Sequence, residues 1–322
     1  MFLSTLLIVS SLLLISSHAE DIDGLQEVKG LHSFPRLTYG TAWKKDATAD
    51  LVYHAVRAGF RHIDTACQPK HYNEAGVGEG WNRAALELEL SRTEMWLQTK
   101  YTATQGQDLN NPIPYDPTAS KQDQVRQSVD TSLLHLQTDY LDSLVMHGME
   151  DEWEDTFKVW TAFEELVDAG TVRQLGISNI YHPPALQYLY ENVRIKPAVV
   201  QNRFYGDSNY DVAIRAFCVE HHIEYQSFWT LGANRHFVGN DIVRKLATLR
   251  RVSPEAIMYA LVMKLGHTPL DGTTSPEHMK DDMDLLQRIQ GGEEIISDDD
   301  LPLLIQILGI PPVQPEEEAE EL

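Results

Sequence analysis

Short apolar segments alternate with longer amphipathic ones over most of the chain, and this alternation limits the fold more than any other feature of the sequence. Segments 95–100 and 140–147 have the composition of buried strands, whereas 120–137 and 154–170 have the apolar periodicity of helices. Strands that alternate with helices pair in parallel, because each helix returns the chain to the same edge of the sheet. About eight such units in one domain predict an α/β fold, a (β/α)8 TIM barrel over residues 37–309.

The remaining elements follow the same pattern. Strands are expected at 60–65, 172–179, 198–203, 223–228 and 268–272, and helices at 47–59, 253–266 and 275–289. Ser253 and Pro254 form a typical helix start, and Gly170 a typical helix end. Val125, Val129, Leu133 and Leu134 are expected to form the buried face of their helix.

A doubly wound parallel sheet is the alternative fold. It would normally place a glycine-rich phosphate-binding turn after its first strand. Residues 37–43 read LTYGTAW and contain one glycine, so the dinucleotide-binding fingerprint is missing and the barrel is preferred.

The two ends of the chain differ from the repeating part. Residues 1–19 are largely apolar and end in Ser-His-Ala, which predicts a secretory signal peptide cleaved after Ala19. Residues 20–36 form a leader, and the proline-punctuated acidic segment 310–322 is predicted to be a disordered tail. We therefore expect entry into the secretory pathway, with an uncleaved membrane anchor as the alternative.

The formal net charge of −22 excludes unassisted nucleic-acid binding, because phosphate contacts need clustered lysine and arginine. Binding to anionic membrane surfaces is disfavoured for the same reason. The expected partner is a small molecule, and the protein is expected to be a monomer without membrane contact once the signal is removed.

Four groups that exchange protons or donate hydrogen bonds fall at or just after strand ends. Asp64, Lys100 and His147 end the second, third and fourth strands, and Tyr72 follows in the loop after the second. In a barrel these ends converge on one rim, where active sites form. A lysine ammonium near a tyrosine favours the phenolate and lowers the tyrosine pKa, and an aspartate would hold that lysine in place.

Such a set can polarise and protonate a carbonyl group. Tyr72 would act as a general acid, and a neutral His147 would donate a hydrogen bond to the carbonyl oxygen. The electron pair must come from a hydride-donating cofactor.

These segments resemble the aldo-keto reductases. The resemblance lies in GFRHIDTA (59–66) with the following Tyr72 and Asn73-Glu74, LQTK (97–100), DYLDSLVMH (139–147) and LVDAGTVRQLGISN (166–179). It implies a (β/α)8 barrel and NADPH-dependent reduction of an aldehyde or ketone to an alcohol. It also implies a catalytic tetrad, which consists of Asp64, Tyr72, Lys100 and His147.

The same resemblance implies a cofactor bed. Ser178, Asn179 and Gln201 would bind the nicotinamide carboxamide, and Phe228 would stack on the ring. The residues expected nearer the phosphates and the adenosine are Leu231, Gly232, Thr273, His278 and Asp282.

Other residues complete the predicted site. The entrance for the substrate, beside His147, is predicted to be lined by Trp43, Trp81 and Trp229. No metal site is expected, because the strand ends offer no His-x-His pair or clustered carboxylates.

The proton donor has two candidates. Tyr72 lies eight residues after Asp64, a longer spacing than the common family motif, and counting back from Asn73-Glu74 places His71 in the tyrosine position. A histidine also donates protons and titrates nearer neutrality. Some family members have a longer loop of this kind in which the tyrosine serves, so Tyr72 is preferred.

The segment expected at the adenosine 2′-phosphate departs from the family pattern. Gly272, Thr273 and His278 stand where a lysine, a serine and an arginine are usual, and Asp281 and Asp282 follow. The expected cofactor is NADPH, with NADH possible, unless Lys280 or Arg235 supplies the missing charge. A catalytically weak barrel that serves as a cofactor-binding or regulatory module is the alternative function.

Overall fold

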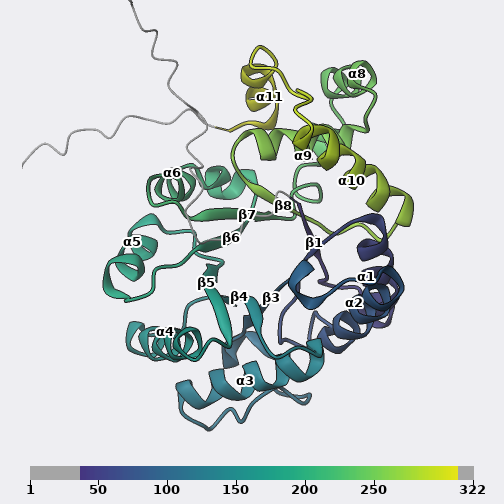
Figure 1. Cartoon of the computed structure of the whole chain (residues 1–322). Helices are drawn as coiled ribbons and strands as arrows, with labels where there is room; N and C mark the ends of the chain where they lie inside the picture. Colours follow the sequence, from purple (N-terminus) through teal and green to yellow (C-terminus); the bar gives the residue numbers. More distant parts are fainter. Residues whose placement is uncertain (1–36, 311–322) are drawn as a thin grey trace, which may run out of the picture.

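The computed structural model describes residues 37–310, and these form a closed barrel of parallel strands with helices outside (Figure 1). Each strand pairs with the next, and β8 pairs with β1 through Thr38–Leu270 and Tyr39–Asp271. This confirms the predicted barrel and rules out the doubly wound sheet. The strands are β1 (Thr38–Gly40), β2 (His62–Asp64), β3 (Trp96–Tyr101), β4 (Leu141–Met146), β5 (Val172–Ser178), β6 (Val199–Arg203), β7 (Glu224–Phe228) and β8 (Thr268–Asp271).

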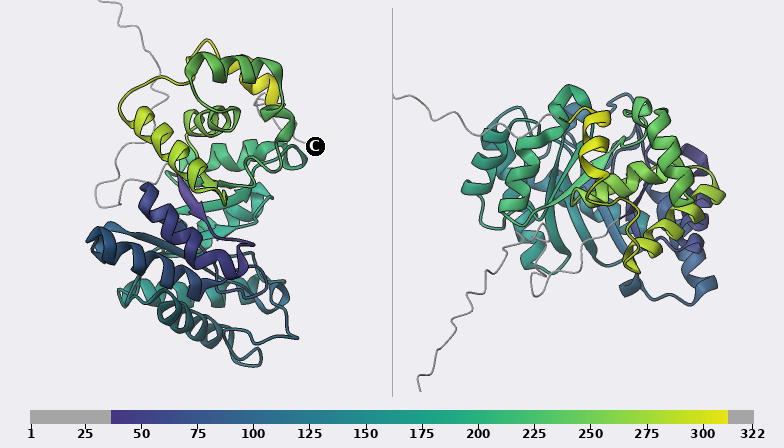
Figure 2. Two further views of the ribbon diagram at one scale, coloured as in Figure 1. Left: turned by 90° about the vertical axis from the view of Figure 1, so that its right-hand side faces the viewer. Right: turned by 90° about the horizontal axis from the view of Figure 1, so that it is seen from above.

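Helices surround the strands, and the connection from β7 to β8 is the most elaborate because it holds three of them. The α-helices are α1 (Thr48–Ala58), α2 (Glu74–Leu88), α3 (Lys121–Leu136), α4 (Trp153–Asp168), α5 (Pro183–Asn192), α6 (Val212–Glu220), α7 (Arg235–Val238), α8 (Asp241–Arg250), α9 (Pro254–Lys264), α10 (Pro276–Gln290) and α11 (Leu301–Leu308). Short 3-10 helices are η1 (Lys45–Ala47), η2 (Arg92–Glu94), η3 (Thr104–Gly106) and η4 (Gly206–Asp211). α10 packs against α1, so the first and last parts of the barrel lie together (Figure 2).

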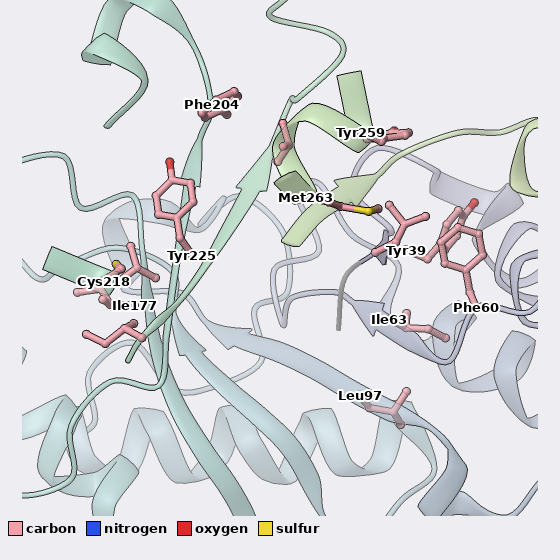
Figure 3. Packing of buried hydrophobic residues seen from close by; sticks show 14 of the residues in the cluster. Tyr39, Phe60, Ile63, Leu97, Ile177, Phe204, Cys218, Tyr225, Tyr259 and Met263 are labelled. Atoms are coloured by element: carbon pink, nitrogen blue, oxygen red, sulfur yellow. The ribbon is translucent and has the colours of Figure 1, made fainter. Parts of the chain in front are cut away.

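The hydrophobic core fills the layer between the strands and the helices. The first three strands and the turn before β2 contribute the buried residues Tyr39, Phe60, Ile63 and Leu97 (Figure 3). The same cluster includes Tyr225 of β7 and Tyr259 of α9. Every residue of α9 from Ala256 to Met263 is buried, so this helix is a core element. Burial of apolar area at this scale is the main favourable contribution to folding.

The helix boundaries follow local chemistry. Ser253 caps α9, because its hydroxyl accepts the Ala256 N–H at 3.0 Å, and Gly170 follows α4 with a φ of +76°, which glycine adopts without strain. The predicted buried face of α3 is wrong at Leu134, whose exposure is 76%. The last turn instead buries Leu136 and Ser132, so the apolar stripe is rotated away from Leu134.

The signal, the leader and nearly all of the predicted acidic tail lie outside the described residues. Within residues 37–310, none of the helices combines the length and the apolar character needed to cross a bilayer.

Candidate active site

A cavity of about 980 Å³ lies at the carboxyl ends of the strands, where the loops that follow β1 to β8 meet. Its wall includes Asp64, Tyr72 and His147 among the predicted catalytic groups. Lys100 lies directly behind the wall and is fully buried. The fold therefore brings the four predicted groups together at the rim where barrel active sites form.

Lys100 and Asp64 form a buried ion pair. The Lys100 ammonium donates to both Asp64 carboxylate oxygens, at 2.7 and 2.6 Å, and to the Thr65 carbonyl at 2.8 Å. It lies 5.3 Å from the centroid of the Tyr72 ring. All three ammonium protons have acceptors, so the lysine is held as a fixed positive charge beside the tyrosine.

A layer of glutamine side chains crosses the barrel interior and supports Asp64. Gln98 and Gln201 both donate to Asp64 Oδ1, at 2.8 and 2.9 Å, and both also donate to Gln226 Oε1, at 2.7 and 2.9 Å. These residues come from β3, β6 and β7. The sequence analysis did not identify Gln98 or Gln226, although each stands on a strand facing inward.

The pKa shifts differ in part from expectation. Burial, followed by the negative charge of Asp64, raises the pKa of Tyr72, so these two effects outweigh the lowering expected from the Lys100 ammonium. Burial lowers the pKa of Lys100, although Asp64 opposes that change. Burial, Lys100 and His71 lower the pKa of His147 to about 3, which keeps its imidazole neutral as expected. The tyrosine is thus a protonated donor at neutral pH.

His147 is oriented by a neighbouring hydroxyl. Its Nδ1 lies 2.7 Å from Thr102 Oγ1, and its ring centroid lies 5.9 Å from that of Tyr72 in an edge-on arrangement. In the tautomer in which Nδ1 accepts the hydroxyl proton, Nε2–H is left to donate into the cavity.

His71, the alternative acid, also lines the cavity but has different neighbours. Its ring lies 4.0 Å from that of Trp43, and its pKa is lowered by partial burial and by Lys70. Tyr72, not His71, has the Lys100 ammonium over its ring. The geometry favours Tyr72 as the proton donor.

The residues predicted to hold the nicotinamide all line the cavity. Ser178 donates to the Gln201 carbonyl at 2.6 Å, and the Asn179 amide donates to the His147 carbonyl at 2.7 Å. Their oxygens and Gln201 Oε1 remain able to accept from a carboxamide N–H, and Phe228 offers a ring face nearby. This end fits a nicotinamide, and Leu231 and Gly232 line the same cavity.

The opposite end is acidic. Glu255, Asp271, Asp281 and Asp282 line it together with Thr273 and His278. Asp271 accepts from the Thr273 N–H at 2.8 Å, and burial together with the neighbouring carboxyl raises the pKa of Asp282. Because like charges this close repel, the Asp271 carboxyl favours the protonated form of Asp282.

Two cations near that end, Lys44 and Lys280, serve other partners. Lys44 donates to the Gly272 carbonyl at 2.9 Å, and burial lowers its pKa to about 8 against the opposing effect of Asp271. Lys280 pairs with Asp284 on the exposed side of α10 and does not line the cavity. The carboxylates of this end oppose a 2′-phosphate, whereas Arg235 lines the same cavity and offers a positive charge to one.

Two exposed tryptophans stand at the mouth. Trp43 and Trp229 line the cavity, are 59% and 53% exposed, and have φ of +65° and +57°. Large residues rarely adopt such backbone conformations, and strain of this kind concentrates at functional sites. Trp81 does not contribute, because it is buried and its indole N–H donates to the Leu136 carbonyl at 2.9 Å.

A second polar cluster lies outside the cavity. Cys67, Glu74 and His135 place one potential metal ligand each within 4.8 Å of one another. Glu74 already accepts hydrogen bonds from Thr99, from Ser132 at 3.0 Å and from His135 Nδ1 at 3.1 Å. The carboxylate is thus satisfied by protein donors and ties α2 to β3 and α3.

The chain is similar to several reductases. It is 26% identical to methylglyoxal reductase DkgA of Yersinia pestis over 76% of this chain and 80% of that protein, and 28% identical to D-galacturonate reductase of Fragaria ananassa over 89% and 90%. The structure resembles that of a Bombyx mori aldo-keto reductase in complex with NADP, with a TM-score of 0.71 and 21% identity over 86% of this chain and 90% of that one. The sequence profile of the aldo/keto reductase family matches residues 28–233. Because that match covers more than half of the chain and includes all four predicted catalytic positions, the chain belongs to the aldo/keto reductase family.

Proposed function

We propose that this chain reduces an aldehyde or ketone to an alcohol with a reduced nicotinamide cofactor, and that Tyr72 is the general acid. The family is one of NAD(P)H-dependent oxidoreductases with NADPH as cofactor. The observation that carries the proposal is the arrangement of a protonated Tyr72, the Lys100–Asp64 pair and a neutral His147 around one cavity.

The side chains divide the work. A reduced nicotinamide held by Ser178, Asn179 and Gln201 would supply a hydride to the carbonyl carbon. His147 Nε2–H donates to the carbonyl oxygen and orients it, and the Tyr72 hydroxyl gives that oxygen its proton. The Lys100 ammonium stabilises the phenolate left on Tyr72 until solvent restores the proton. Asp64 positions Lys100, since it holds the ammonium through both oxygens.

The substrate is a small carbonyl compound in this proposal. Similar proteins are named for methylglyoxal, D-galacturonate and D-xylose, which share a reactive carbonyl on a small polar molecule. The acidic end of the cavity supports a weak preference for NADPH over NADH, because each lost charge-assisted bond to phosphate costs about 1.5–3 kcal/mol.

The test is a titration of the purified protein with NADPH and NADH, following tryptophan fluorescence, and then an assay of cofactor oxidation with a panel of aldehydes and ketones. We expect NADPH to bind no more than about tenfold more tightly than NADH at pH 7.5. A His278→Arg variant should increase that ratio. Tight cofactor binding without turnover on any carbonyl would favour the alternative, a cofactor-binding or regulatory module.

The protein is further proposed to enter the secretory pathway as a monomer. The apolar segment 1–19 is the basis, and an uncleaved anchor is the alternative. Amino-terminal sequencing of protein recovered from secreting cells distinguishes the two, since cleavage leaves Glu20 as the first residue. Size-exclusion chromatography of the same material tests the oligomeric state.

A further inference from the structure

We propose that the preferred substrates bear a carboxylate in addition to the carbonyl group, and that Arg203 binds this carboxylate. This inference rests on the proposed reductase function and adds a substrate class to it. Arg203 is the last residue of β6 and lines the same cavity as Tyr72 and His147. It was not singled out from the sequence.

Arg203 is enclosed by aromatic rings. Its guanidinium carbon lies 4.3 Å from the centroid of the Trp229 ring, 5.2 Å from that of Tyr205 and 6.0 Å from that of Phe228. Stacking of this kind stabilises a guanidinium but gives it no hydrogen-bond acceptor. The rings fix the plane of the guanidinium, and its buried Nε–H is left without an acceptor in residues 37–310.

No carboxylate of residues 37–310 forms an ion pair with Arg203, and its Nε is buried without a hydrogen-bond partner. Among the other partly buried arginines, Arg92 pairs with Asp142 and Arg250 with Asp300, whereas Arg61 and Arg215 donate to backbone carbonyls or to His267. In a chain of net charge −22, a guanidinium whose Nε is buried without a partner is unexpected in a cavity lined by several carboxylates. Arg203 is partly buried, and a buried N–H without an acceptor is costly, so an anionic ligand would relieve that cost.

The position of Arg203 connects the anion to the reaction. Its backbone N–H donates to the Tyr181 hydroxyl at 3.2 Å, and that hydroxyl donates to Asn179 Oδ1 at 3.3 Å. Asn179 is a predicted nicotinamide contact, so Arg203 belongs to the reacting end of the cavity. A planar carboxylate matches the fork of an arginine in a bidentate manner. Aldehyde acids and keto acids combine the two groups that this end of the cavity recognises.

The anion could also be the cofactor pyrophosphate, and the experiment separates the two sources. The pyrophosphate is expected over Leu231 and Gly232, whereas Arg203 faces the exposed Trp229 at the mouth. The assay compares 4-carboxybenzaldehyde with its methyl ester, which differ mainly in charge. Proteins are wild type, Arg203→Met and Arg203→Lys. Arg244→Met is the control, because that arginine is exposed on α8 and does not line the cavity.

We expect wild type to prefer the acid, and Arg203→Met to lower kcat/KM for the acid by about 10- to 100-fold while changing that for the ester by less than about threefold. Arg203→Lys should keep part of the preference, and Arg244→Met all of it. NADPH affinity should be the same in all four proteins. Equal losses for acid and ester together with weaker NADPH binding would assign Arg203 to the pyrophosphate and overturn the proposal.

A binding measurement keeps the inference testable apart from turnover. Benzoate is titrated into the NADP-loaded protein, and tryptophan fluorescence or calorimetry gives its Kd. We expect Arg203→Met to weaken benzoate binding by at least about tenfold, with unfolding temperature and NADP affinity unchanged. Benzoate binding that does not depend on Arg203 would overturn the inference. Arg203-dependent binding without any carbonyl turnover would leave the carboxylate site standing and refute the reductase function instead.

Discussion

At the scale of single residues, Tyr72 combines a buried ring, a neighbouring ammonium and a place on the cavity wall. Tyr72→Phe removes the proton donor and keeps the ring, so kcat should fall by roughly 10²–10⁴-fold, the usual contribution of a positioned acid. His71→Phe should lower kcat by less than about tenfold, because its neighbour is Trp43 and not Lys100. Single-turnover kinetics with saturating cofactor measure both, and the opposite ranking would transfer the role to His71.

Lys100 supplies the charge that stabilises the phenolate. Lys100→Met removes that charge and leaves Asp64 buried beside the phenol, so the pKa of Tyr72 should rise further and kcat should fall by at least about 100-fold. The pH profile of alcohol oxidation, which needs the phenolate, should move to higher pH. Unchanged turnover in this variant would show that the tetrad does not drive the reaction.

Asp282 links the acidic end of the cavity to stability. The pKa of Asp282 is raised in the folded protein, so folding favours its protonated form. Its contribution to the free energy of unfolding is therefore complete below the ordinary carboxyl pKa of about 4 and is lost as the pH increases through the raised pKa. The Asp282→Asn variant has no carboxyl to ionise at this position, so its free energy of unfolding should exceed that of wild type by at least about 1 kcal/mol near pH 9 and differ little near pH 5. Thermal unfolding at the two pH values tests this. Glu277→Gln is the matched control, because Glu277 is exposed on the same helix and does not line the cavity.

At the scale of elements, the glutamine layer joins β3, β6 and β7 across the barrel interior. Gln226→Leu removes the acceptor shared by Gln98 and Gln201 and leaves two buried amides with fewer partners. The free energy of unfolding should fall by about 1–3 kcal/mol in urea denaturation. Cofactor affinity should change little, because Gln226 does not line the cavity. A neutral or stabilising result would mean that the layer does not support the fold.

The sequence predicts the positions of residues well where the strand–helix repeat fixes them, and poorly where the conformation of a loop fixes them. Asp64, Lys100 and His147 could be placed because each ends a strand and parallel strands end at the same rim. Arg203 also ends a strand, but the rings that enclose it come from Tyr205 and Trp229 in two separate loops. Helix periodicity likewise did not determine which side of the last turn of α3 faces inward, which is why Leu134 was misplaced.

The acidic end of the cavity shows the same limit. The sequence indicated that Gly272 and His278 replace the usual cations there, but not that the carboxyls of Asp271 and Asp282 form a close pair. That pairing depends on how β8 and α10 are joined, and the loop between them lacks a periodic pattern. The position of Lys280 could not be read from the sequence either, because an exposed lysine turns toward whichever carboxylate is nearest, here Asp284.

At the scale of the whole molecule, the closing contact joins residues that are very far apart in the chain. β1 pairs with β8, so Thr38 meets Leu270. Contacts of such high sequence separation form late, because the chain loses loop entropy before it gains the interaction. During synthesis from the amino terminus, β1 cannot pair with β8 until nearly all of the described chain has emerged. The growing polypeptide therefore exposes an unpaired strand edge for most of its synthesis, and holding that edge apart from other chains is a task for the chaperones at the exit of the ribosome or translocon.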